Sequence, residues 1–514
     1  MKDKKRLYVN IIATIMSFAV NMGISFFLTP YVVKYIGVAS NGFVGLANNF
    51  VSYAQLFTVA LNSMAGRFIT IKIHQKDDDG ASRYFSSVII ANILISVILT
   101  IGFGIVILFI NKLFDIPDEL ITDVRLLWAF IFANFILSVY TSIFSTATFV
   151  KERLDLSSIA NIIGYILRAV ILIIFYVMVK STVVWYMGLA TFCSGAFLLA
   201  INAAYKKRLL PELKFSKDKF DFKAIKELIA SGIWNTITKL SSILSSGLDL
   251  LISNIFVSAT AMGILSITKT IPTNMLSFFA AIGYVFAPQI TINYAKENYD
   301  EIKKQVIYAI RLLSMFSSIA LAALFAFGKE FYSLWQPTQD STQLYILTII
   351  SCLQHVFCMP LEPLYNIFTA TNKIKASSIA LIISSTLTIL TVFVSLNFAT
   401  TDMAKLMIIA GTSTIMEMIR VLVFLPMYGA KCIRCKKGTF YPIILKNTIS
   451  FVVITGVGLL MKNVYSITSW GKLVVALIML GIIGFSLNLV FLLNKEDRAK
   501  FLSKIKNKLK RQGE

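Results

Sequence analysis

Polar side chains recur at helical spacing in an otherwise apolar segment near the middle of the chain. Within residues 225–257 they are separated by steps of four and three, and they are Asn235, Lys239, Ser242, Ser246, Asp249 and Ser253. This spacing places them on one face of a helix. A charge within a membrane-spanning helix is costly, so it normally faces a cavity or a partner. We therefore expect this face to line the path of whatever the protein moves.

Cations occur inside several apolar segments. Lys239 and Arg168 lie near the middle of theirs, and Lys269 lies in the outer third of its own. Cations that face a cavity suit a phosphate-bearing substrate, because Arg offers a fork of donors and Lys a compact point charge. The alternative for Lys239, Asp249 and Lys269 is an internal ion-pair network that locks helices together. Asp249 is also a candidate for coupling transport to a proton or sodium gradient.

Two later segments carry further charges that suit coupling or gating. Glu417 and Arg420 are three residues apart and can pair on one helix face, as a gate, a structural bridge or a substrate contact. Glu362 stands between Pro360 and Pro363. Such a break is a candidate hinge or cation site, because unwound transporter helices expose backbone carbonyls. No catalytic residue, metal site or bound cofactor is expected.

The elements that carry these residues are predicted to be transmembrane helices. The chain has 514 residues, of which 57% are hydrophobic, well above the apolar share of a globular domain. About fourteen stretches are long enough to cross a bilayer. None alternates as a barrel strand does, so all should be helices. The expected spans are 9–33, 42–66, 84–110, 123–150, 156–179, 183–204, 226–257, 262–292, 304–327, 342–370, 374–398, 403–428, 440–462 and 470–493.

The formal net charge of +23 is distributed as in a membrane protein rather than a nucleic-acid-binding protein. With the amino terminus inside, cytoplasmic segments hold about 36 of the 49 Lys and Arg residues, and outer segments hold about eight. This positive-inside pattern predicts that both termini are cytoplasmic and that the basic loops contact membrane lipids. No role in nucleic-acid binding is expected.

An internal repeat relates the two halves of the chain. Residues Tyr35–Gly42 precede the second span, and Phe256–Gly263 precede the eighth at an offset of 221. Ser157–Ala160 and Ser377–Ala380 match at an offset of 220. Each repeat contains six spans, and an even number of spans returns the chain to the side of the membrane on which it started. The two repeats should therefore be parallel in the membrane. The expected organisation is a six-helix bundle over 1–204, a cytoplasmic linker over 205–227, a second bundle over 228–428, two further helices over 429–493 and a basic cytoplasmic tail over 494–514.

The repeat extends the polar face to neighbouring spans. Ser242 corresponds to Asn21 in the first span, and Lys269 to Asn48 in the second, which also carries Gln55. Transporters built from parallel repeats carry substrate between the halves, near the midplane. We expect these residues, together with Asn235, to surround one cavity.

The chain lacks the motifs of several enzyme classes. It contains no nucleotide phosphate loop, no zinc-protease HExxH sequence and no GxSxG nucleophile elbow. We therefore expect a transporter driven by a gradient, and not an enzyme.

The chain resembles the polysaccharide transport family of the multidrug/oligosaccharidyl-lipid/polysaccharide (MOP) flippase superfamily. The residues that carry the resemblance are Thr29-Pro30-Tyr31 at the end of the first span and the turn over Tyr35–Gly42, on an architecture of twelve plus two spans. The resemblance implies an all-α membrane protein with two parallel six-helix bundles and two extra carboxy-terminal helices.

The resemblance also implies a function, a location and partners. A Wzx-like flippase of a bacterial inner membrane moves a polyprenyl-diphosphate-linked oligosaccharide from the cytoplasmic to the outer leaflet for O-antigen, lipopolysaccharide, capsule or exopolysaccharide synthesis. Its expected partners are the lipid-linked glycan, membrane lipids, a polysaccharide polymerase and glycosyltransferases. A cation-coupled multidrug exporter and a peptidoglycan lipid II flippase are the alternatives. The absence of Arg and Lys between Tyr8 and Tyr31 disfavours the lipid II flippase.

Overall fold

The structure is a computed structural model that describes residues 2–151, 153–371 and 373–492. Throughout these ranges the chain forms helices joined by short turns, and no strand is present in them. A helical run passes through each of the fourteen apolar stretches. The basic tail expected over 494–514 lies outside the described residues.

Eleven of the described helices are long and apolar enough to cross a membrane. The number is twelve if α14 (Ser341–Cys352) and α15 (His355–Leu361), bent by 46° at their junction, form one span. The helical runs over 222–256 and 259–284 are not in this set, and they contain the polar segment and Lys269. The all-helical membrane fold is therefore confirmed, and the count of fourteen spans stays a prediction.

The chain forms two compact units. The first contains Met1–Ser266 and Thr400–Leu406, and the second contains Ile267–Ala399 and Met407–Glu514. The predicted boundary between bundles was the linker over 205–227, whereas residues 228–266 here belong to the first unit. They do so because α9 (Phe222–Ser242) packs along α2 (Val38–His74). A Cβ at Gly232 would overlap the Ala60 carbonyl, so only glycine permits this approach.

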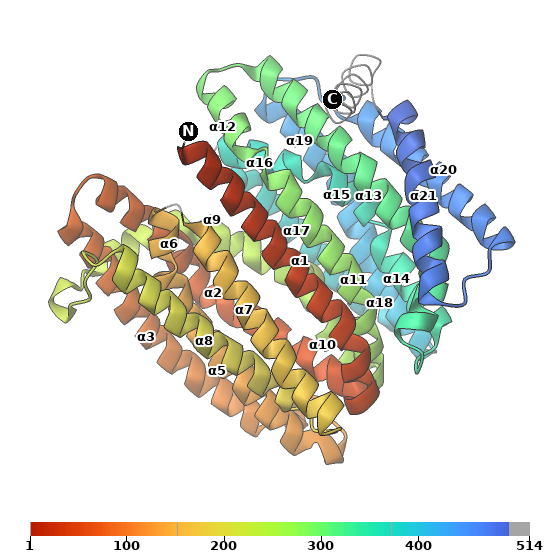
Figure 1. Cartoon of the computed structure of the whole chain (residues 1–514), viewed down its shortest axis with the longest axis horizontal. Helices are drawn as coiled ribbons and strands as arrows, with labels where there is room; N and C mark the ends of the chain where they lie inside the picture. The colour runs from red at the N-terminus through yellow and green to blue at the C-terminus, as the bar shows by residue number, and fades with distance from the viewer. Residues whose placement is uncertain (1, 152, 372, 493–514) are drawn as a thin grey trace, which may run out of the picture. The chain divides into compact units, whose positions relative to one another are not determined.

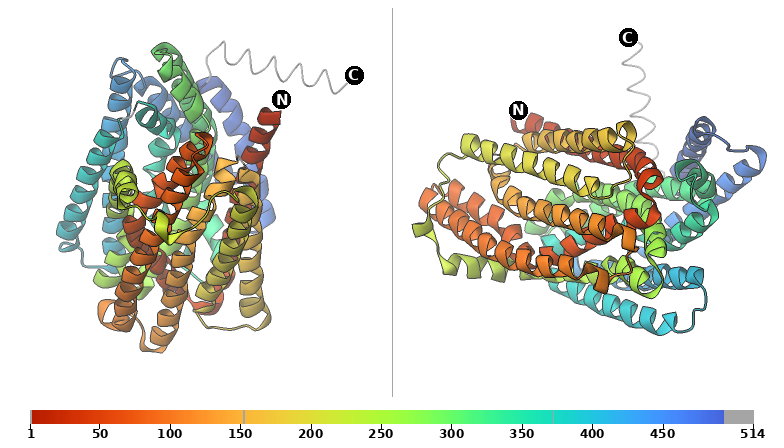
Figure 2. Two further views of the ribbon diagram at one scale, coloured as in Figure 1. Left: turned by 90° about the vertical axis from the view of Figure 1, so that its left-hand side faces the viewer. Right: turned by 90° about the horizontal axis from the view of Figure 1, so that it is seen from below.

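Helices of the first unit run side by side, with α8 between α5 and α7 (Figures 1 and 2). In addition to α2 and α9, the first unit contains the helices α1 (Lys2–Ile36), α3 (Asp78–Leu108), α4 (Ile110–Leu113), α5 (Ile121–Phe144), α6 (Thr146–Val150), α7 (Leu154–Ile173), α8 (Tyr186–Leu209) and α10 (Asp249–Phe256). Short 3-10 segments, η1 (Asp118–Leu120) and η3 (Lys217–Lys219), and π segments, η2 (Ile174–Met178) and η4 (Ile243–Gly247), join them. The first turns of α11 (Ala259–Tyr284) also belong to this unit.

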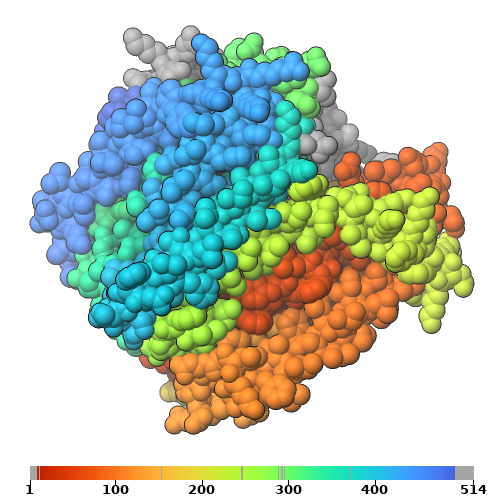
Figure 3. All heavy atoms as spheres, turned by 180° about the vertical axis from the view of Figure 1, so that it is seen from behind, coloured from red at the N-terminus to blue at the C-terminus, as the bar shows by residue number. Residues whose placement is uncertain are grey.

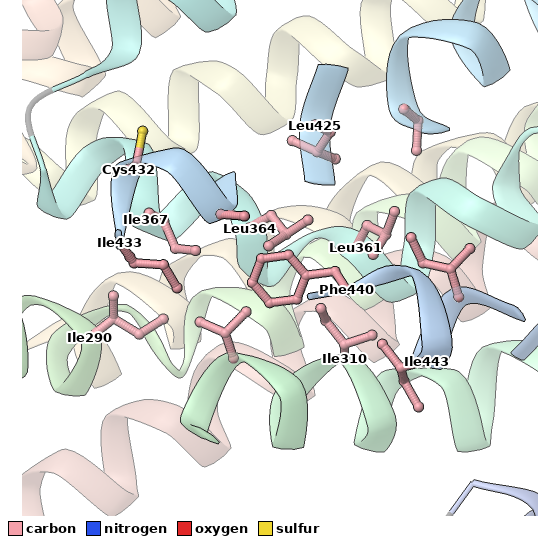
Figure 4. Close-up of a cluster of buried hydrophobic side chains, with 14 of the residues drawn as sticks. Ile290, Ile310, Leu361, Leu364, Ile367, Leu425, Cys432, Ile433, Phe440 and Ile443 are labelled. Carbon is pink, nitrogen blue, oxygen red and sulfur yellow. The ribbon is translucent and has the colours of Figure 1, made fainter. Parts of the chain in front are cut away.

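The second unit is built around the long helix α13 (Tyr299–Trp335), on which α14, α15, α20 (Tyr441–Val464) and α21 (Trp470–Phe491) pack. Its other elements are α12 (Ala287–Ala295), α16 (Pro363–Ala370), α17 (Ile374–Leu396), α18 (Asp402–Ile419), η5 (Arg420–Phe424) and α19 (Leu425–Cys432). One core cluster surrounds the buried ring of Phe440, with Ile310 and Leu364 close to it (Figure 4).

Buried polar contacts attach the two additional helices to this unit. Asn488 of α21 donates to the Met315 carbonyl at 2.8 Å and to the Ser318 hydroxyl at 2.9 Å, and Ser450 of α20 donates to Asn488. Interhelical hydrogen bonds of this kind are typical of membrane helix packing. α20 and α21 are therefore integral to the second unit.

Side-chain caps start helices in the loops. Asp77 accepts from the Gly80 amide at 2.8 Å at the start of α3, and Asn298 accepts from the Glu301 amide at 3.2 Å at the start of α13. The hydrogen bond from the Lys72 ammonium holds the pKa of the Asp77 carboxyl below its ordinary value. This short loop is thereby fixed between two spans.

Candidate functional site

The polar segment predicted to be one helix is interrupted. α9 ends at Ser242, a π turn occupies Ile243–Gly247, and α10 begins at Asp249. The Gly247 carbonyl accepts from the Asn49 amide at 2.8 Å and from the Tyr53 hydroxyl at 2.6 Å. Because a backbone group without a partner is costly in hydrocarbon, these two side chains of α2 stabilise the interruption. π turns within helices occur frequently at functional sites.

The interruption distributes the polar residues over different environments. Asp249 is 5% exposed and Ser253 is fully buried, whereas Ser242 is exposed. Asn235 donates to the Ser63 hydroxyl on α2 at 3.0 Å. The prediction of one uninterrupted polar face is therefore wrong, because a π turn adds a residue and rotates the following helix.

The two mid-span cations of the first unit are partly buried. Lys239 lies on α9 and Arg168 on α7, beside Tyr165. Neither forms an ion pair in the part of the chain that the structure describes. Asp249, by contrast, lies within electrostatic range of Tyr53. Lys239 and Arg168 therefore stay candidates for binding an anion, as the sequence predicts.

The neutral candidates lie on α1 and α2. Asn21 and Gln55 are partly buried, and Asn48 is exposed with its amide donating to Val44 of its own helix at 2.9 Å. The sequence prediction missed Asn49, which contacts the π turn. A glycine that follows two serines inside a span is a weak helix former and was the signal available for this interruption.

A charged cluster lies inside the second unit. The Arg420 guanidinium donates to both carboxylate oxygens of Glu417, one at 2.9 Å, and to the Tyr365 hydroxyl at 3.0 Å. Cys358 contacts Glu417 at 4.0 Å, and Glu362 lies within electrostatic range of the pair. The predicted Glu417–Arg420 pairing is therefore present, and Tyr365 is a member that the sequence did not reveal.

Pro360 of α15, beside this cluster, leaves one backbone carbonyl that takes its partner from another helix. Pro360 has no backbone N–H, so the Val356 carbonyl one turn earlier loses its helical donor. The Asn447 amide of α20 donates to that carbonyl at 2.8 Å, and both residues are buried. Asn366 likewise donates to the Gly283 carbonyl at 2.9 Å. The proline was visible in the sequence, but its distant partner was not.

Lys269 of α11 lies in the second unit. It is partly buried and within electrostatic range of His355, which is 7% exposed. Within the described ranges no group of three or more His, Cys, Asp and Glu residues has the arrangement of a metal site.

Corresponding residues of the repeat meet inside the first unit. A Cβ at Gly42 would lie 2.9 Å from Gly263 Cα, and a Cβ at Gly45 would lie 2.8 Å from Ser266 Oγ. Both pairs have the repeat offset of 221. Positions that contact their own counterparts are expected on the axis of a two-fold relation. The starts of α2 and α11 therefore contact each other as a parallel repeat predicts.

A second contact closes the same end of this unit. Asn254 of α10 accepts from the Asp115 amide at 3.1 Å and donates to the Asp115 carbonyl at 3.2 Å. The Asp115 carboxylate accepts from the Ala259 amide at 3.3 Å. The loop after α4 is thus joined to the turn between α10 and α11.

Comparisons with known proteins agree with this architecture. Residues 7–291 match the family model described as "Polysaccharide biosynthesis protein". The chain is 25% identical over 466 residues to the "Uncharacterized membrane protein EpsK" of Bacillus subtilis (strain 168), with 91% of each chain covered.

Two solved structures have the same fold. The lipid II flippase MurJ in an inward closed conformation has a TM-score of 0.67 at 16% identity and covers 94% of this chain and 98% of its own. An inward-facing multidrug resistance MATE family transporter of the MOP superfamily has a TM-score of 0.66 at 16% identity, with 84% and 97% covered. The chain belongs to the family described as "Polysaccharide biosynthesis protein".

Proposed function

We propose that this membrane protein flips a polyprenyl-diphosphate-linked oligosaccharide from the cytoplasmic to the outer leaflet of a bacterial inner membrane. The observation that carries the proposal is the polysaccharide biosynthesis family match over residues 7–291. Lys239 and Arg168 form no ion pair among the described residues. They support the proposal, because a diphosphate cannot cross hydrocarbon without compensation of its charge. O-antigen, lipopolysaccharide, capsule and exopolysaccharide synthesis are the processes that use such a substrate.

Each group of site residues has a distinct role in this proposal. Lys239, Arg168 and Lys269 attract the diphosphate, and the polar side chains of α1, α2 and α9 hydrogen-bond sugar hydroxyls. Alternating access requires the contacts of Asp115 with α10 and α11 to open during release to the outer leaflet. The expected topology, with both termini cytoplasmic, places that end of the unit outside.

The decisive test is the fate of the lipid-linked glycan in cells. Deletion of the gene should cause polyprenyl-linked oligosaccharide to accumulate on the cytoplasmic side, as measured by mass spectrometry of extracted lipids. Lys239→Ala and Arg168→Ala should reproduce the accumulation with normal amounts of protein in the membrane. Lys472→Ala, at an exposed position, is the matched control. Normal surface polysaccharide in both the Lys239→Ala and the Arg168→Ala variant would contradict the cationic site.

A cation-coupled multidrug exporter is the second candidate, and the buried cluster of Glu362, Glu417 and Arg420 favours it. Buried carboxylates can bind a proton or sodium ion during a transport cycle. In this case deletion should sensitise cells to toxic cations without accumulation of lipid-linked glycan. The same deletion strain therefore separates the two functions.

A further inference from the structure

Hydrogen bonds hold the linker between α8 and α9 against the first turns of α3. The backbone amides of Lys214, Ser216 and Asp221 donate to the hydroxyls of Ser82, Ser86 and Ser87 at 3.2, 3.1 and 2.9 Å. Leu210 and Leu213 are buried in the adjoining core. The linker therefore has a defined conformation. In Figure 3 it projects, in yellow-green, at the right-hand edge of its unit.

This fixed linker exposes aromatic side chains. Phe215, Phe220 and Phe222 are 45%, 42% and 70% exposed, although they lie within eight residues of one another. Exposed large apolar groups gathered in this way mark a surface that contacts a membrane or a partner. Leu210 and Leu213 already anchor the linker in the core of its unit, so the exposed phenylalanines are available for a different contact.

The acidic residues of the region are engaged by neighbouring groups. Glu212 pairs with Lys151 at 3.5 Å, Asp221 pairs with Arg83 at 3.4 Å, and Glu227 accepts from Tyr84 at 2.6 Å. Six exposed cations form no ion pair within the described part of the chain; they are Lys207, Arg208, Lys214, Lys217, Lys223 and Lys226. The linker surface is therefore both apolar and strongly basic.

We propose that residues 206–226 bind anionic phospholipid of the cytoplasmic leaflet, with the exposed cations on the headgroups and the phenylalanines among the acyl chains. Aromatic rings at the interface combined with Lys and Arg produce this type of binding. The proposal rests on the cytoplasmic placement of the linker in the proposed function. Bound in this way, the linker anchors the inner end of the first unit to the bilayer surface.

The test uses the full-length protein in nanodiscs that contain a trace of photoreactive phosphatidylglycerol or photoreactive phosphatidylcholine. Mass spectrometry of the digested protein measures the lipid attached to linker peptides. Each cation near an anionic surface contributes about fivefold to binding, so even two cations in contact with headgroups should make phosphatidylglycerol label the linker at least about tenfold more than phosphatidylcholine. This preference should fall at high salt.

Two variants with the same charge change separate the linker from a general charge effect. Lys214→Gln, Lys217→Gln and Lys223→Gln together should reduce the preference for phosphatidylglycerol at least about tenfold. The matched control replaces three exposed lysines in another basic loop, Lys431, Lys436 and Lys437, by Gln and should retain it. Phe215→Ser, Phe220→Ser and Phe222→Ser together should reduce labelling by both lipids.

Several results would overturn the proposal. They are equal labelling by the two lipids, unchanged labelling in the linker variant, loss of labelling when millimolar inorganic phosphate is present during irradiation, and a co-purified protein that covers the linker. An Asp218→Cys variant that reacts with thiol reagents only from outside the cell would refute the topology as well. Glycan export is measured separately, so normal export without lipid labelling would contradict this inference and leave the flippase function intact.

Discussion

The hydrogen bond from Asn447 to the Val356 carbonyl gives a sharp prediction about the bent tenth span. Asn447→Leu keeps a side chain of similar size but removes the donor. The Val356 carbonyl, to which Pro360 cannot donate because it has no N–H, then loses its hydrogen bond to α20. A buried carbonyl left in this state costs about 1–3 kcal/mol, and single interhelical bonds in membranes reach about 1.7 kcal/mol. The Asn447 side-chain oxygen has no partner itself, so its removal offsets part of the loss. We expect destabilisation of about 1–2 kcal/mol.

A second substitution tests the proposed cause directly. Pro360→Ala supplies the missing N–H within α15, whose backbone is helical on both sides of Pro360. Asn447→Leu should therefore cost much less in the Pro360→Ala background than in the parent protein. The difference between the two costs is the coupling energy of the pair, and we expect about 1 kcal/mol.

The assay is thermal unfolding of the purified protein in detergent, followed with a thiol-reactive dye that reports exposure of buried cysteines. About 1 kcal/mol corresponds to a shift of about 2–4 °C for a unit of this size. Asn397→Leu is the matched control, because that amide donates within its own helix at an exposed position. Equal losses from Asn447→Leu with and without Pro360 would refute the reasoning.

Three further predictions concern the two units. Gly263→Ala should destabilise the protein by at least about 2 kcal/mol, because its Cβ overlaps the backbone of α2, whereas Gly471→Ala, in open space, should be neutral in the same unfolding assay. Glu417→Gln should lower the free energy of unfolding by about 3 kcal/mol, because it leaves Arg420 buried and unpaired. Replacing Glu417 by Leu and Arg420 by Met together should lower it by less. Equal losses in the single and the double variant would contradict a structural role for the pair. The pKa of Asp77 is lower in the folded protein, so its stabilisation of α3 is present above about pH 4 and lost as the pH falls through the folded pKa. The hydrogen-exchange protection of amides at the start of α3, taken relative to their intrinsic exchange rate at each pH, should therefore fall as the pH is lowered below about 4, and Asp77→Asn should abolish this dependence.

The sequence predicted the features that depend on local composition. Long apolar stretches with basic loops on one side predicted a helical membrane protein, and every expected span contains a helix in the structure. The offset of 221 predicted which residues correspond, and Gly42 and Gly263 contact each other. The spacing of Glu417 and Arg420 predicted their pairing, because residues three apart share a helix face.

The tertiary structure decided where those helices break and what completes them. The π turn at Gly247 depends on Asn49 and Tyr53, about 200 residues earlier. The Val356 carbonyl, which Pro360 leaves without its helical donor, depends on Asn447, 91 residues away along the chain. Hydropathy and helical spacing describe only neighbours along the chain, whereas a backbone group in hydrocarbon takes its partner from whichever helix packs beside it. The sequence by itself therefore determined that the protein spans the membrane and carries buried charge. The packing of its helices decided that the polar segment from Asn235 to Ser253 is not one continuous face.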